Sequence, residues 1–171
     1  MNALRGALRR HPTNLRIITH QAPDLDAVVA AWLAQTYLFD GMAEVCFFSR
    51  RLDAESHAAA CLVDVGNACD PARLRFGHKP PAFADRNQTC AAKLVWEHLL
   101  ALGKRVGHLE PLVQVTFEGD TRRFSPALRQ SRIDGPHAAL GYARCRHTSD
   151  EACYTEMRFW LDAYEQAARP P

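Results

Sequence analysis

Short apolar runs separated by longer amphipathic stretches set the hydrophobic pattern of this chain. The runs at residues 15–19, 43–49 and 61–65 are rich in β-branched, aromatic or other apolar side chains and predict three strands, the third buried on both faces. A broad apolar face predicts a helix over residues 26–39, between the first two strands. A short extended piece is expected around residues 74–76.

The second half of the chain carries helical patterns. The clearest helix covers residues 88–103, where apolar side chains recur at helical spacing and Gly103 supplies a C-cap. Further helices are expected over about residues 109–116 and over residues 150–168. Residues 119–149 are polar and rich in arginine, and their pattern is hard to assign to any element.

Strands that alternate with helices predict parallel pairing and an α/β fold, here a three-layer sandwich with a mainly parallel sheet. A length of 171 residues with 47% apolar residues suits one domain. We expect residues 1–14 to form an N-terminal arm or surface helix, and residues 15–171 to form a single domain with a helical C-terminal extension.

Charge and composition narrow the class of protein. The formal charge of +2 is too small to indicate nucleic-acid binding by itself. No apolar run reaches the length of a membrane span, so no membrane partner is expected. The six cysteines include no CxxC pair and lack the density of a disulfide scaffold, which favours reduced thiols and a cytoplasmic location.

Candidate chemistry gathers where the predicted strands end. His20 ends the first strand, Asp24 and Asp26 follow it in the turn before a helix, and Asp64 lies near the end of the third strand. In a parallel sheet these side chains can converge at the carboxyl edge, where ligands collect. Carboxylates and imidazole suit Mn²⁺, and carboxylates suit Mg²⁺. Helix capping explains one aspartate equally well but leaves the other three residues without a reason.

These stretches resemble motifs of the DHH phosphoesterase superfamily. In "THQAPDLDAVVAAWLA" a strand ends in His and x-x-P-D-x-D opens a helix; "LVDVGNACDPARLRFGHKPP" resembles the second and third motifs, as found in a DHH-like group of metal-dependent hydrolases or exonucleases; and "TCAAKLVWEHL" resembles the helix that follows. The resemblance covers about residues 15–120. It implies a DHH-domain-like fold, while the second, substrate-binding domain usual in the family is not expected here.

The resemblance also implies a ligand set. It assigns metal ligands at His20, Asp24, Asp26 and Asp64, with Asp64 bridging two cations, Mn²⁺ or Mg²⁺. His20 and Asp24 would hold one ion and Asp26 the other.

The triplet that gives the family its name reads Gly77, His78 and Lys79 here. His78 and Lys79 are therefore the expected catalytic residues, with Lys79 facing the substrate phosphate as a point charge. An ordinary polar loop before two prolines explains the same three residues equally well.

A fourth family motif places a carboxylate after the long helix. Glu118 and Asp120 are both available, and we take Asp120 as the expected metal ligand with Glu118 as the alternative. A loose run of arginines follows, which suits either a phosphate or a solvated face. The run consists of Arg122, Arg123, Arg129 and Arg132.

The sequence therefore predicts a divalent-metal-dependent phosphohydrolase or phosphoesterase of DHH type. Its substrate would be a nucleotide, an oligonucleotide or a small phosphate ester, so the expected partners are phosphate-containing small molecules or short nucleic acids. A homodimer is left open. The alternative is a catalytically degenerate relative that binds metal, nucleotide or a protein partner without turnover.

Overall fold

The computed structural model describes residues 15–49, 52, 57–85 and 87–170. The arm expected over residues 1–14 lies outside these residues. The strands are β1 (Arg16–His20), β2 (Glu44–Phe48), β3 (Cys61–Val63), β4 (Cys69–Asp70) and β5 (Arg75–Phe76). The three strands predicted from apolar runs are confirmed as β1, β2 and β3, and the expected extended piece is β5.

Six α-helices carry most of the described chain. They are α2 (Leu25–Leu33), continued by the π-helical turn η1 (Ala34–Leu38), α3 (Ala91–Ala101), α4 (Glu110–Asp120), α5 (Pro126–Asp134), α6 (Pro136–Arg146) and α7 (Asp150–Ala168). Two 3₁₀ turns are η3 (Pro71–Arg73) and η4 (Gly107–Leu109). Residues 119–149, which the hydrophobic pattern left unassigned, contain the helices α5 and α6.

The strand order is β2-β1-β3-β5-β4. β1 pairs in parallel with both β2 and β3, β3 pairs in parallel with β5, and β4 runs antiparallel to β5. The protein is therefore an α/β fold with a mostly parallel sheet. From β1 the chain crosses to β2 on one side and later returns to β3 on the other, so the switch in direction lies between β1 and β3.

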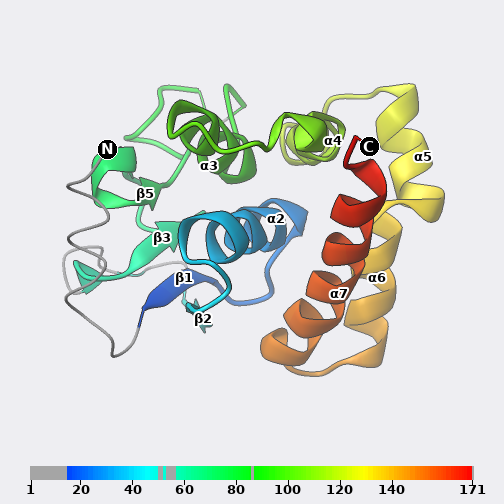
Figure 1. Ribbon diagram of the computed structural model, residues 1–171, viewed down its shortest axis with the longest axis horizontal. Coiled ribbons are helices and arrows are strands. Elements are labelled where there is room, and N and C mark those ends of the chain that lie inside the picture. The colour runs from blue at the N-terminus through cyan, green and yellow to red at the C-terminus, as the bar shows by residue number, and fades with distance from the viewer. Residues whose placement is uncertain (1–14, 50–51, 53–56, 86, 171) are drawn as a thin grey trace.

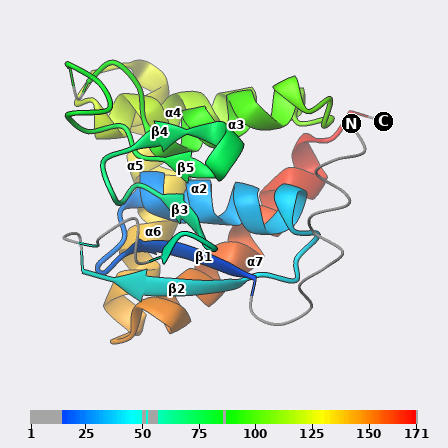
Figure 2. The same ribbon diagram turned by 90° about the vertical axis from the view of Figure 1, so that its left-hand side faces the viewer.

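Helix α2 forms the centre of the core. Every residue from Leu25 to Leu33 is buried, because the helix is apolar on all sides and is enclosed by the sheet below it and by α3, α4 and α7 around it (Figures 1 and 2). Asp24 caps its first turn, with Oδ1 accepting a hydrogen bond from Ala27 N at 3.1 Å. The start of α2 is thereby fixed directly beside the end of β1.

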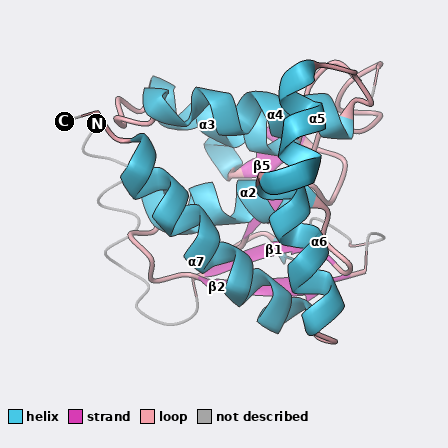
Figure 3. Ribbon diagram, turned by 90° about the vertical axis from the view of Figure 1, so that its right-hand side faces the viewer, coloured by secondary structure: helices cyan, strands magenta, loops and turns pink. Residues whose placement is uncertain are grey.

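The two faces of the sheet are packed differently. Ile17 and Val63 contribute to the main core with the helices, whereas Ile18 and Leu62 point to the opposite face and join a smaller cluster with Val65. On the helical side, α6 and α7 run side by side, and α7 packs against the edge strand β2 (Figure 3). None of the described helices combines the length and apolar character needed for a bilayer crossing. All six cysteines are free thiols.

Candidate metal and phosphate site

A cluster of titratable side chains lies at the carboxyl ends of the parallel strands. We call it the histidine–aspartate cluster; its members are His20, Asp24, Asp26, Asp64, His78, Lys79 and Asp120. His20 is the last residue of β1, Asp64 directly follows β3, and His78 follows β5. The cluster therefore lies at the β1/β3 switch point, where open α/β sheets bind ligands.

The His20 imidazole is fully buried, and its two nitrogens have different partners. Nδ1 lies 2.8 Å from the carbonyl oxygen of Gln21, which can only accept, so Nδ1 carries a proton. Nε2 faces two carboxylates, at 2.9 Å from Asp64 Oδ2 and 3.8 Å from Asp24 Oδ2. Burial alone would lower the pKa of His20, but these partners outweigh it and raise that pKa. Nε2 can therefore take a second proton or a cation. Metal-binding histidines are commonly oriented like this, with the other ring nitrogen donating to a carbonyl oxygen.

Asp64 lies at the centre of the cluster. Its backbone turns into the left-handed region with φ 53°, a conformation that aspartate tolerates better than most residues and that ends strand β3. While Oδ2 faces His20, Oδ1 lies 3.0 Å from His78 Nε2 and 2.7 Å from Lys79 Nζ. Burial raises the pKa of Asp64, but the histidines and the lysine outweigh it and hold the carboxyl ionised.

Three carboxylates converge on the second imidazole. His78 Nε2 lies 3.0 Å from Asp64, 3.6 Å from Asp26 Oδ2 and 3.8 Å from Asp120 Oδ2. Its Nδ1 is buried and has no hydrogen-bond partner in the described part of the chain. Burial lowers the pKa of His78, but the surrounding carboxylates raise it overall. The negative charge here requires a proton or a cation at its centre.

Asp26 has a second role that the sequence pattern did not predict. Its Oδ2 and Oδ1 accept hydrogen bonds from the amides of Ala91 and Ala92, at 2.8 and 2.7 Å, in the first turn of α3. Burial, and then the charges of Asp64, Asp120 and Asp24, raise the pKa of Asp26 to about 7. One signal could have indicated this role. Helix α3 begins after Cys90, whose side chain makes no capping hydrogen bond, so the first amides of the helix need another acceptor.

Two groups within the cluster have the geometry to hold a metal ion. One consists of His20, Asp24 and Asp64, the other of Asp26, Asp64 and His78, and in each the ligand atoms lie within 4.8 Å of one another. Asp64 belongs to both groups, as a bridging carboxylate would. The donors are carboxylate oxygens and imidazole nitrogens, which fit Mn²⁺ well and Mg²⁺ in part.

The remaining predicted residues divide between cluster and surroundings. Asp120 reaches the cluster, whereas the alternative, Glu118, accepts hydrogen bonds from Gln114 and Ser125 instead. Gly77 precedes the cluster, and a Cβ added there would meet the backbone of Asn67 and Ala68.

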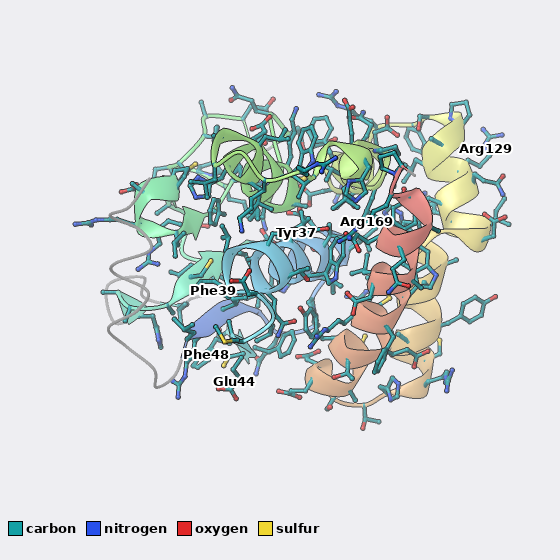
Figure 4. The ribbon with its side chains drawn as sticks, in the orientation of Figure 1. Tyr37, Phe39, Glu44, Phe48, Arg129 and Arg169 are labelled. Atoms are coloured by element: carbon teal, nitrogen blue, oxygen red, sulfur yellow. The ribbon has the colours of Figure 1, made fainter. Side chains whose placement is uncertain are left out.

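The arginine run does not act as one surface. Arg123 lies over the Phe117 ring, with 4.5 Å from its guanidinium carbon to the ring centroid. Arg129 points outward from α5, away from the sheet (Figure 4), and lines a different hollow together with Arg132. Arg122 alone lines the pocket beside the cluster.

That pocket has a volume of about 390 Å³ and carries charges of both signs in its lining. The lining includes three carboxylates, from Asp24, Asp26 and Asp120, together with Arg122, His137 and Arg144. His137 and Arg144 were missed because they come from α6, a helix that the hydrophobic pattern did not reveal.

Hydrogen bonds hold the side chains of Arg144 and His137 in this pocket. The Arg144 guanidinium donates hydrogen bonds to the carbonyls of Ala22 and Pro23, in the loop that carries Asp24. His137 Nδ1 lies 2.8 Å from Ser131 Oγ, and burial, together with the charge of Arg132, lowers the pKa of this imidazole. A neutral His137 and two guanidinium groups therefore line the same pocket as the carboxylates, an arrangement suited to an anionic group beside a cation.

No protein-family model, curated protein or solved structure matches this chain. A function for this chain is therefore inferred from the geometry of the cluster and its pocket.

Proposed function

We propose that this protein is a divalent-metal-dependent phosphohydrolase or phosphoesterase of DHH type. The observation that carries the proposal is the pair of histidine–carboxylate groups that share Asp64 at the switch point of the sheet. The pocket beside them supports an anionic substrate, since Arg122 and Arg144 line it together with the carboxylates. Its volume of about 390 Å³ favours a nucleotide or small phosphate ester over the body of an oligonucleotide.

Each part of the site has a defined task in this proposal. His20, Asp24 and Asp64 bind and orient the cation, which is Mn²⁺ or Mg²⁺. When bound, a divalent cation would activate a water molecule near neutral pH and would neutralise negative charge on the phosphoryl group. Arg122 and the ammonium of Lys79 hold phosphate oxygens.

Two further cluster residues have other roles, one in proton transfer and one in positioning a helix. His78, held between carboxylates, keeps or releases a proton at Nε2. Asp26 joins the cluster to the start of α3 and thereby fixes the position of that helix beside the pocket.

The proposal also includes a finer expectation about the fold, a three-layer sandwich of the DHH-domain kind. This arrangement requires a covering layer on the face of Ile18 and Leu62. Both side chains are fully buried, which supports such a layer.

A second candidate is a degenerate relative that binds metal, nucleotide or a protein partner without turnover. It is favoured by Lys79, which pairs with Asp64 at 2.7 Å, and by Gly77, which replaces a carboxylate of the DHH pattern. Losing part of the charge stabilisation at a phosphoryl group costs about a hundred- to a thousandfold in rate.

The test is a hydrolysis assay on the full chain, stripped of metal by chelator and supplied with Mn²⁺ or Mg²⁺. The panel contains p-nitrophenyl phosphate, bis(p-nitrophenyl) phosphate, mononucleotides and dinucleotides. We expect metal-dependent product release that falls at least about a hundredfold in Asp64→Asn. The matched control is Asp134→Asn, which removes a carboxylate at the end of α5, outside the cluster.

The outcomes separate the two candidates. Turnover that persists in Asp64→Asn or in chelator would contradict the proposal. Metal binding without turnover of any panel member would support the second candidate.

A further inference from the structure

Lys79 places its ammonium on the carboxylate that the two candidate metal groups share. Its ammonium nitrogen lies 2.7 Å from Asp64 Oδ1, the same oxygen that lies 3.0 Å from His78 Nε2. The Asp64 side chain is 1% exposed, whereas that of Lys79 is 32% exposed. The lysine therefore brings a positive charge from the edge of the cluster onto a buried carboxylate.

One of the two candidate metal groups shares a carboxylate oxygen with the lysine. In the group of Asp26, Asp64 and His78, both oxygens of Asp26 accept amide hydrogen bonds from α3, and Oδ1 of Asp64 pairs with Lys79. A divalent cation there would meet an ammonium on the same oxygen, and the two positive charges would repel each other.

The group of His20, Asp24 and Asp64 is better suited to an ion. It uses the other oxygen of Asp64, Oδ2, which faces His20 Nε2 at 2.9 Å. The proton on the opposite nitrogen of His20 is directed to the Gln21 carbonyl, which leaves Nε2 oriented toward the carboxylates. The Asp24 side chain is 43% exposed and lines the pocket, so a cation can enter from that side.

We propose that the cluster binds a single divalent cation through His20, Asp24 and Asp64, and that the ammonium of Lys79 takes the place of a second one. The inference deepens the proposed function, because it depends on metal binding at the same cluster. It replaces the two ions implied by the DHH resemblance with one ion and one fixed ammonium, which together supply the positive charge that a phosphoryl group requires.

The experiment counts ions, so it does not depend on finding a substrate. Chelator-treated full chain is titrated with MnCl₂ by calorimetry, and the bound Mn²⁺ is examined by electron paramagnetic resonance. We expect one Mn²⁺ per chain, with the spectrum of an isolated ion. In Lys79→Met, which keeps the length of the side chain but removes its charge, we expect two Mn²⁺ per chain and a spectrum broadened by coupling between neighbouring ions.

Lys93→Met is the matched control. Lys93 belongs to α3, lies over the ring of Phe117 and is outside the cluster. It should bind one Mn²⁺, as the parent does. Lys79→Gln serves as a second uncharged variant, and circular dichroism reports whether each variant is folded. If neither Lys79 variant folds, the count in the parent chain decides.

Two Mn²⁺ in the parent, or one in folded Lys79→Met and Lys79→Gln, would overturn this inference. No bound Mn²⁺ would overturn both the inference and the metal dependence of the proposed function. One ion in the parent and two in Lys79→Met, without hydrolysis of any phosphate ester, would support the inference and contradict the hydrolase proposal alone.

Discussion

Gly77 stands where the DHH pattern has an aspartate, and the surrounding backbone leaves no room for a side chain. A Cβ at this position would lie 2.8 Å from Ala68 N and 3.0 Å from Ala68 O. The Gly77 amide also donates a hydrogen bond to Ala68 O at 2.8 Å, next to the paired strands β4 and β5. The glycine at this position therefore has a local structural reason, and an aspartate here would displace backbone.

The first prediction is that Gly77→Ala lowers the free energy of unfolding by about 1–3 kcal/mol, since the new methyl group would press on backbone that cannot rotate away. Urea unfolding at equilibrium measures it. The control is Gly141→Ala in helix α6, where a Cβ has no neighbour within 4 Å. We expect that variant to gain about 0.5–1 kcal/mol from helix propensity. Equal stability of both variants would contradict the close approach at Gly77.

Helix α3 depends on a carboxylate from another helix for its start. Cys90, the residue before its first turn, makes no side-chain cap, and the amides of Ala91 and Ala92 donate to Asp26 of α2. These amides are buried, so they would lack a partner without Asp26. The same carboxylate thus connects the packing of α2 and α3 with the histidine–aspartate cluster.

The second prediction is that Asp26→Ala destabilises the metal-free chain by about 2–4 kcal/mol, because two buried amide groups lose their acceptor at about 1–3 kcal/mol each. The measurement is urea unfolding at pH 6, where most of a carboxyl with a pKa of about 7 is protonated and charge repulsion contributes little. Asp70→Ala is the control, since Asp70 caps the short turn η3 with a half-exposed side chain. A loss no larger than that of Asp70→Ala would contradict the capping role.

Helix α7 is held near the end of α2 by a polar contact. Glu165 Oε1 accepts hydrogen bonds from the Tyr37 hydroxyl at 2.6 Å and from Arg169 Nε at 2.7 Å. Figure 4 shows Tyr37 and Arg169 close to each other between the two helices. Burial alone would raise the pKa of Glu165, but these two donors lower it below the ordinary value.

The third prediction follows from that lowered pKa. An ionised Glu165 contributes stability that is present above its unfolded pKa of about 4.5 and is lost as the pH falls through its lower native pKa. We expect the free energy of unfolding of the parent to exceed that of Glu165→Gln by roughly 1 kcal/mol at pH 7. Most of this difference comes from the Tyr37 hydrogen bond, because Arg169 is exposed.

Below pH 4.5 this difference should shrink toward zero, which urea unfolding at several pH values would reveal. Glu44→Gln, which removes an exposed pair with Arg16, serves as the control and should change stability by less than about 0.5 kcal/mol at each pH. A difference between parent and Glu165→Gln that does not vary with pH would contradict the assignment.

Elements with a clear apolar pattern were predicted from sequence, and several elements without one were not. Helix α7 was predicted with its full bounds because its apolar side chains recur regularly after the Ser149 cap. Helix α5 buries only Leu128 and Ser131, so its sequence has almost no apolar period. Strand β4 has two residues, too few for any alternation to be visible.

At the scale of the whole molecule, sequence order placed part of the site and not the rest. His20 ends β1 and Asp64 directly follows β3. Because the alternation of strands and helices predicts a parallel sheet whose strand ends share one edge, their convergence could be predicted. Arg144 reaches the loop before Asp24 from more than a hundred residues away, through a helix without a clear pattern. The pairing of Lys79 with Asp64 depends on how the chain turns after β5, which spacing alone does not determine.

The fourth prediction is that Mn²⁺ stabilises the whole fold. The ligands His20, Asp24 and Asp64 come from β1, the start of α2 and the end of β3, so they meet only in the native chain, and an ion that binds there shifts the unfolding equilibrium by linkage. At a concentration a hundredfold above Kd, the gain is about 2.7 kcal/mol. For a chain of this length it corresponds to a rise in Tm of roughly 5–10 °C.

Asp64→Asn is the decisive variant, because asparagine tolerates the left-handed backbone at this position and keeps the size of the side chain. It removes the charge that both candidate metal groups share, so the rise in Tm with Mn²⁺ should fall to nearly zero, while Asp134→Asn should respond as the parent does. Thermal unfolding followed by circular dichroism, with Mn²⁺ and with chelator, measures all three chains. An equal rise in Asp64→Asn and in the parent would mean that Mn²⁺ stabilises the protein from another site, and Asp64 would then be a structural partner of His20 and Lys79 only.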